Sequence, residues 1–257
     1  MLLLALDTAT PAVTVALHDG STVLAETSAT DRRRHAELLA PAIERVLAQA
    51  GAGASDLTDV AVGTGPGPFT GLRVGLVTAR MTASALGLRL HGVSTLDALA
   101  AQAVEDGTVG SDFLVATDAR RREVYWAAYC VDLAVDGGPQ RGADGGVVGV
   151  GGDGGVRGSG GRGGVGAGVP LPERVDGPHV ARAADVPRDG RAVVGRGAEL
   201  YDADLGPAVA PLDPSAGALA RLVVRRLAAG ADLSDVEPRY LRRPDVHESA
   251  ARKSVLG

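Results

Sequence analysis

The sequence predicts an α/β fold of two lobes, each a mixed sheet flanked by helices. The chain has 257 residues, close to the size at which a single core stops growing. Strand patterns followed by crossing helices fill its first hundred residues, and a second pair of strand patterns then repeats that opening. We therefore expect a first lobe at residues 1–106 and a second at residues 107–257.

Three short extended runs open the chain: LLLALDTAT, VTVALHDG and STVLAETSAT. Thr-Pro and Asp-Gly pairs separate them, and Asp-Gly is a strong hairpin signal. The first lobe is thus predicted to begin as a meander of three strands.

Two amphipathic or buried helices follow the meander. Apolar residues recur at helical spacing over residues 35–50, with Asp31 as the expected N-cap and Gly51 just past the end. The strand VAVGTG then leads through a Gly- and Pro-rich loop into residues 72–86, which are small or apolar around most of the helix, as in a buried helix. LRLHGVS predicts another strand, and residues 95–104 another helix.

The second lobe is expected to open with FLVATDAR and EVYWAAYC, paired strands separated by Arg120 to Arg122. RAVVGRGA predicts a late strand, residues 214–229 a helix that returns to the first lobe, and PRYLRRPDV an extended tail. Residues 137–168 are about half glycine with almost no large apolar side chain, which predicts a disordered insertion.

Composition limits the partners. The net charge of −5 argues against a chain that holds nucleic acid by itself, because phosphate neutralisation supplies most of that affinity. Cys130 is the one cysteine, so no disulfide framework is expected and a cytoplasmic location fits. The apolar run at residues 1–6 is far shorter than a membrane span, so we expect no membrane association.

The string GTGPGPFTGLR places a glycine-rich loop between a strand and the start of a helix, where exposed N–H groups favour anions. Asp7 stands at the end of the first strand, beside two threonines. An alternative remains open: the loop is a tight structural turn and Asp7 caps it. The candidate phosphate-binding residues, interpreted as vestigial, are Asp7, Thr8, Thr10, Gly65, Gly67, Thr70 and Gly71.

Taken together, ALDTAT, RRRHAELLAPAIERVL, VGTGPGPFTGLRVGL, LHGVSTLDALA, ATDARRREVYWAAY and PRYLR resemble, in order and spacing, the TsaB (YeaZ) family. This family is a paralogue of the TsaD/glycoprotease family. The resemblance implies two ribonuclease H-like lobes of the actin, Hsp70 and sugar-kinase superfamily.

The resemblance also implies a function. TsaB pairs with TsaD, and together with TsaE the assembly transfers a threonylcarbamoyl group to the adenosine adjacent to the anticodon of tRNAs reading codons that begin with A. A chain of this kind is a non-catalytic subunit without a cofactor, a homodimer when alone, and in contact with tRNA only through the complex.

The resemblance places no metal on this chain. TsaD holds its metal with two histidines in a motif of the form G-V-N-H-L-E-G-H, where this chain has GVSTLDAL. Thr95 and Leu99 stand at the histidine positions, and neither supplies a ligand that a metal ion would favour. We therefore expect no metal site and no catalytic residue.

In the family, the helices at 35–50 and 72–86 form the surface that binds TsaD or a second copy. The alternative is that they only cover their own sheet. The expected interface residues are His35, Leu38, Leu39, Ala42, Ile43, Val46, Leu72, Val74, Leu76, Val77, Ala79, Arg80 and Ala83.

Two enzyme functions compete with this interpretation. The first is an ATP-binding, kinase-like enzyme or ATPase that uses the Asp7 hairpin and the Gly65 loop as phosphate clamps. The second is a peptidase, which the sequence disfavours because it has no G-x-S-x-G elbow. His35 and His91 have no second ligand at metal spacing in the sequence, and His18, His179 and His247 have less context still.

Overall fold

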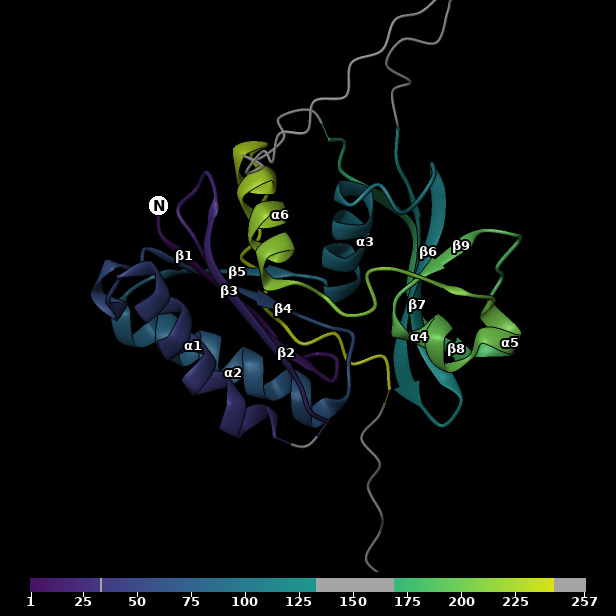
Figure 1. Cartoon of the computed structure of the whole chain (residues 1–257), viewed down its shortest axis with the longest axis horizontal. Coiled ribbons are helices and arrows are strands. Elements are labelled where there is room, and N and C mark those ends of the chain that lie inside the picture. The colour runs from purple at the N-terminus through teal and green to yellow at the C-terminus, as the bar shows by residue number, and fades with distance from the viewer. Residues whose placement is uncertain (33, 133–168, 243–257) are drawn as a thin grey trace, which may run out of the picture.

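The computed structural model of the protein describes residues 1–32, 34–132 and 169–242. They form two five-stranded mixed sheets with helices packed against them (Figure 1). The predicted α/β fold with two mixed sheets is therefore confirmed. The insertion predicted at 137–168 and His247 lie outside the described residues.

The first sheet has the strand order β3-β2-β1-β4-β5. The first three strands are the predicted antiparallel meander, and the other two run parallel to β1. The bounds are β1 (Leu3–Asp7), β2 (Ala12–His18), β3 (Val23–Thr30), β4 (Asp59–Gly63) and β5 (Arg89–Val93).

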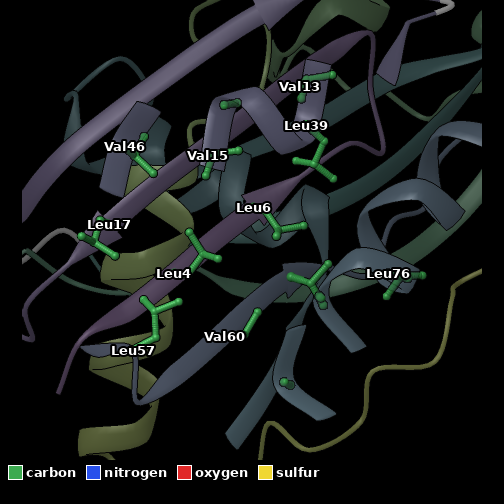
Figure 2. Close-up of a cluster of buried hydrophobic side chains, with 14 of the residues drawn as sticks. Leu4, Leu6, Val13, Val15, Leu17, Leu39, Val46, Leu57, Val60 and Leu76 are labelled. Atoms are coloured by element: carbon green, nitrogen blue, oxygen red, sulfur yellow. The ribbon is translucent and has the colours of Figure 1, made fainter. Parts of the chain in front are cut away.

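Alternate side chains of these strands enter two different cores. Leu4, Leu6 and Val15 point toward α1 (His35–Ala50) and α2 (Phe69–Leu86), in the cluster drawn in Figure 2. Leu3 and Ala5 point the other way, toward α6 (Ala216–Ala228). The sheet is thus buried on both faces, with α1 and α2 on one side and α6 on the other (Figure 1).

The helix ends show what the sequence predicted well and what it did not. The structure gives α1 the predicted bounds, and Gly51 ends it at a φ of 65°. The predicted N-cap, Asp31, is wrong, because Arg34 occupies the N-cap position. Asp31 lies three residues earlier and accepts a hydrogen bond from the backbone N–H of Arg34 at 3.1 Å. The helix α2 begins at Phe69, three residues before the predicted start at Leu72, because the loop turns directly into it after Pro68.

The second sheet has the order β10-β9-β6-β7-β8, which is the same arrangement as the first sheet read from the other edge. β6, β7 and β8 form an antiparallel meander, and β9 and β10 run parallel to β6. The bounds are β6 (Asp112–Arg120), β7 (Glu123–Cys130), β8 (Glu173–Arg182), β9 (Ala192–Val194) and β10 (Ala208–Val209). Cys130, at the end of β7, is a half-buried free thiol.

Short helices complete the second half. α4 (Arg196–Leu200) and α5 (Asp202–Leu205) pack on the outer face of the second sheet, through Ala198 and Leu205. Two 3-10 turns span Ala54–Asp56 and Ala183–Asp185.

Helix α3 (Thr95–Glu105) lies between the two sheets. Leu96 and Leu99 are fully buried against Phe113 and Tyr129 of the second sheet. On the same helix, the carboxylate of Asp97 accepts a hydrogen bond from the Tyr129 hydroxyl at 2.8 Å and another from Arg226 of α6 at 3.0 Å. Burial, together with the Asp97 charge, raises the pKa of Tyr129 well above its usual value, so the phenol stays protonated and donates.

No helix in the described part of the chain is both long and apolar enough to cross a membrane.

Candidate functional site

A cleft of about 760 Å³ lies between the two sheets. One wall comes from the turn after β1 and the first turns of α1 and α2. The opposite wall comes from the β6–β7 hairpin and the tail after α6. The residues that line the cleft are Thr8, Thr10, Pro11, Arg32, His35, Ala36, Gly67, Pro68, Phe69, Thr70, Gly71, Val74, Asp118, Ala119, Arg120, Arg121, Tyr125, Tyr240 and Arg242.

The structure brings most of the predicted phosphate-binding residues into this cleft and leaves two out. The residues that line it are Thr8, Thr10, Gly67, Thr70 and Gly71. Asp7 and Gly65 are not among its lining residues. The Asp7 carboxylate therefore does not face the cleft.

The Asp7 carboxylate is fully buried behind the cleft wall. Its Oδ2 accepts from the Thr95 hydroxyl at 2.7 Å, and its Oδ1 accepts from the Ala9 N–H at 2.7 Å. Desolvation by burial raises the Asp7 pKa to about 6, against the lowering effect of those two hydrogen bonds and of nearby His35. The carboxyl group is thus engaged inside the fold.

The glycines of the loop are explained by packing. A Cβ on Gly63 would stand 1.8 Å from Oδ2 of Asp7, and one on Gly67 would stand 2.3 Å from the carbonyl oxygen of Ala9. A Cβ on Gly71 would lie 2.8 Å from the carbonyl oxygen of Thr8. The loop and α2 therefore approach the β1–β2 turn more closely than any side chain allows.

The histidines of the described chain have local structural partners. His35 Nε2 lies 2.9 Å from the Thr10 carbonyl oxygen, and His91 Nε2 lies 2.8 Å from Asp59 Oδ1. His18 Nδ1 accepts from the Gly20 N–H at 2.9 Å, and burial lowers its pKa. His179 pairs with Asp176 at 2.7 Å. Among the described residues, no group of three or more His, Cys, Asp or Glu side chains could hold a metal ion.

The charge of the cleft comes from arginine. Four arginines line it, with Asp118 as the one lining carboxylate. Arg242 donates to the Ala119 carbonyl oxygen at 2.7 Å and pairs with Glu123 at 3.1 Å. The sequence showed three consecutive arginines in a strand–turn–strand pattern, but did not place them opposite the glycine loop.

The β6–β7 turn holds these arginines in a restricted backbone conformation. Arg120, Arg121 and Arg122 have φ angles of 66°, 55° and 63°, a region that side chains other than glycine, asparagine and aspartate seldom adopt. Arg120 lies opposite Glu123 in the strand register of the hairpin, so Arg121 and Arg122 are the two central residues of the turn. Positive φ at both central positions is typical of tight hairpin turns that favour Asn-Gly.

The outer surface of α2 carries two neighbouring exposed apolar side chains among polar ones. Val77 is 52% exposed and Met81 is 67% exposed, one helical turn apart on the same face. Helix α2 therefore has one open face, in contrast to the burial around most of its circumference that its sequence predicted.

The other expected interface residues divide by burial. Partly buried ones are Leu38, Ile43 and Val74, and Arg80 is exposed but pairs with Glu237 of the tail at 2.7 Å. The members buried beneath the two helices are His35, Leu39, Ala42, Val46, Leu72, Leu76, Ala79 and Ala83. His35 lines the cleft, and the side chains of the others pack beneath the helices and do not form an outer surface.

Comparison with known proteins finds a matching family model and relatives that share about half of this sequence. Residues 22–137 match the family model "TsaD: tRNA N6-adenosine threonylcarbamoyltransferase". The tRNA threonylcarbamoyladenosine biosynthesis protein TsaB of Escherichia coli is 40% identical over 129 residues, covering 50% of this chain and 55% of that protein. An uncharacterized protein of Mycobacterium tuberculosis is 52% identical over 130 residues, 49% of this chain and 58% of that protein. The chain thus spans little more than half the length of these relatives.

A solved structure extends the likeness to almost the whole chain. YeaZ from Pseudomonas aeruginosa superposes with a TM-score of 0.64 and 27% identity, over 93% of this chain and 99% of that one. The chain is thus similar to TsaB proteins over half of its sequence, and to YeaZ in fold over nearly all of it.

The two positions that the sequence comparison set against metal-binding histidines, Thr95 and Leu99, have structural roles in this chain. Thr95 is fully buried and donates to Asp7, and Leu99 is fully buried in the cluster beneath the second sheet.

Proposed function

We propose that this chain is a non-catalytic subunit that binds and supports TsaD in the transfer of the threonylcarbamoyl group to the adenosine adjacent to the anticodon. The tRNAs concerned are those that read codons beginning with A. The proposal includes a cytoplasmic location, TsaE in the larger complex, a homodimer when TsaD is absent, and contact with tRNA only through the complex.

The open face of α2 is the observation that carries the proposal. Val77 and Met81 are both more than half exposed, on a helix whose opposite side is already packed against the sheet. Neighbouring exposed apolar side chains of this kind occur at protein interfaces. The similarity to TsaB proteins makes TsaD the partner to test.

The position of Asp7 favours this function over the kinase-like alternative. That enzyme would need the Asp7 carboxylate beside the phosphates, whereas the carboxylate is bonded to Thr95 behind the cleft wall.

The direct test is reconstitution. Purified TsaC, TsaD, TsaE and tRNA are assayed for threonylcarbamoyladenosine with and without this chain. We expect modification only when the chain is present. Val77→Asp should weaken TsaD binding by about a hundredfold, because a carboxylate would be buried without a partner in an apolar interface.

Val175→Asp is the matched control. Val175 is 56% exposed and lies on β8, away from α2. It should bind TsaD as the unmodified chain does, and both variants should unfold at nearly the same temperature. Co-purification of Val77→Asp with TsaD at full yield would contradict the proposed interface.

A further inference from the structure

The chain after α6 runs past the first sheet toward the second (Figure 1). This tail, residues 231–242, contains no helix or strand. Two backbone hydrogen bonds hold it beside the first sheet. The N–H of Gly92 in β5 donates to the Leu233 carbonyl oxygen at 2.7 Å, and the Arg239 N–H donates to the Thr64 carbonyl oxygen at 2.9 Å. The tail thus covers part of the β5 edge.

Two arginines of α2 hold the tail from the helix side. Arg80 donates to the Val236 carbonyl oxygen at 3.0 Å and to the Glu237 carboxylate at 2.7 Å. Arg73 donates to the Tyr240 hydroxyl at 2.8 Å. Both arginines are exposed, so the tail is tied to α2 by side chains that project from its outer surface.

The same face of α2 carries the exposed Val77. Arg73, Val77 and Arg80 stand four and three residues apart, a spacing that places them on one side of a helix. A stable interface covers about 800 Å² on each partner, which is far more than two side chains. A protein seated on Val77 and Met81 therefore also covers what lies beside them, and the tail is one of those neighbours.

The tail is held loosely compared with the strands beneath it. Leu233 is the one buried residue within 231–242. The side chains of Glu237 and Arg80 are 78% and 44% exposed, and an exposed ion pair contributes little to stability. Segments with few buried contacts open more readily than a core. The docked position of the tail is therefore an equilibrium that a bound partner can shift.

We infer that the tail and the exposed face of α2 form one docking surface, so that TsaD bound on α2 also holds the tail in its docked position. The inference rests on the proposed function, because it takes TsaD as the partner on α2. It adds that binding and tail docking are coupled. Such coupling is reciprocal: release of the tail weakens TsaD binding by the factor by which TsaD suppresses that release.

The first test is hydrogen exchange of single amides in the full chain, with and without saturating TsaD. The N–H groups of Arg239 and Gly92 report on the tail, because their hydrogen bonds join it to the first sheet. We expect both to exchange about tenfold more slowly when TsaD is bound. The Val131 N–H, which donates to the Ser111 carbonyl oxygen at 2.8 Å in the second half, is the control and should not change.

The second test removes the two side-chain ties between the tail and α2. The double variant Glu237→Ala, Tyr240→Ala should bind TsaD about tenfold more weakly, by the same factor as the slowing of exchange. Glu199→Ala is the matched control, because Glu199 forms an ion pair with Arg196 at the same distance of 2.7 Å on α4. It should bind TsaD as the unmodified chain does. Equal melting temperatures establish that a loss of binding does not arise from unfolding.

The outcomes separate this inference from the proposed function. TsaD binding with unchanged or faster exchange at Arg239 and Gly92 would overturn the inference and leave the proposed function standing. Equal affinity of the double variant and the unmodified chain would do the same. Absence of TsaD binding by the unmodified chain would overturn both. If the double variant does not fold, the exchange measurement on the unmodified chain decides.

Discussion

The two hairpin connections that face each other across the cleft share one local hydrogen bond, from a backbone N–H to the aspartate two residues earlier, and differ in what surrounds that aspartate. At the end of β1, Asp7 accepts from the N–H of Ala9, two residues on, at 2.7 Å. Near the end of β6, Asp118 accepts from the N–H of Arg120, again two residues on, at 2.8 Å. Each turn is thus closed by an aspartate at the same place in its own sheet.

The difference lies in what surrounds each carboxylate. Asp7 is fully buried, and Gly63 packs so closely against its carboxylate that a Cβ there would overlap it. Asp118, by contrast, lines the cleft near Arg32. The same local hydrogen bond therefore occurs in two aspartates with different roles. The neighbours decide whether the carboxyl is a buried structural group or part of a charged surface.

The largest effect on stability is expected for Gly63→Ala, which tests the close packing around Asp7. The new Cβ would overlap the Asp7 carboxylate, so the first turn must shift or its buried hydrogen bonds must break. We expect a loss of about 4 kcal/mol in the free energy of unfolding, measured in urea. Gly110→Ala, with no atom within 4 Å of its Cβ position, should change stability by less than about 0.5 kcal/mol. Equal stability of the two variants would show that the first turn is not tightly packed.

The second test is Asp7→Asn. Because the folded pKa of Asp7 is about 6 and its ordinary value 3.8, the folded state holds this proton more tightly than the unfolded state. The group is protonated in both states below about pH 3.8, and stability falls as pH rises from there through about 6. At neutral pH the loss is about 3 kcal/mol, from roughly two pKa units at 1.36 kcal/mol each.

Asp7→Asn removes that loss, because an amide does not ionise. Its oxygen can still accept from Ala9, so the variant should be more stable than the parent at pH 7 and should lack the fall between pH 4 and 6.5. Urea unfolding across that range measures it. An identical profile for Asp7→Asn and the parent would contradict the assigned pKa.

The smallest effect is expected for Arg122→Gly. Arg122 has a φ of 63°, where glycine has no steric penalty. The variant should be stabilised by about 1 kcal/mol, seen as a higher melting temperature. Destabilisation would mean that the Arg122 side chain makes contacts that outweigh the backbone strain.

The sequence predicted the first half of the fold better than the second, for physical reasons. The buried strands and α1 carry continuous apolar runs or helical spacing. β8, which was not predicted, is an edge strand with no buried residue, and it contains Gly177 and Pro178, so it shows no apolar alternation. The helices α4 and α5 have 5 and 4 residues, too short to show a period.

The site was predicted in part. Thr8, Thr10, Gly67, Thr70 and Gly71 could be chosen from the sequence because they lie beside a strand end and a helix start. The inward turn of Asp7 could not, because it depends on Thr95, which is 88 residues away in the chain. The arginine wall likewise depends on how the second sheet faces the first, which no local pattern encodes.

The burial of α3 between the sheets determines how rigid the molecule is. Rotating one sheet against the other would separate the Tyr129 hydroxyl from Asp97 and expose Leu96 and Leu99 to water. Leaving such groups unpaired or exposed is unfavourable, so the width of the cleft is set before any molecule enters it. A rigid opening spares a binding molecule the entropy loss of ordering its host, and it selects for size.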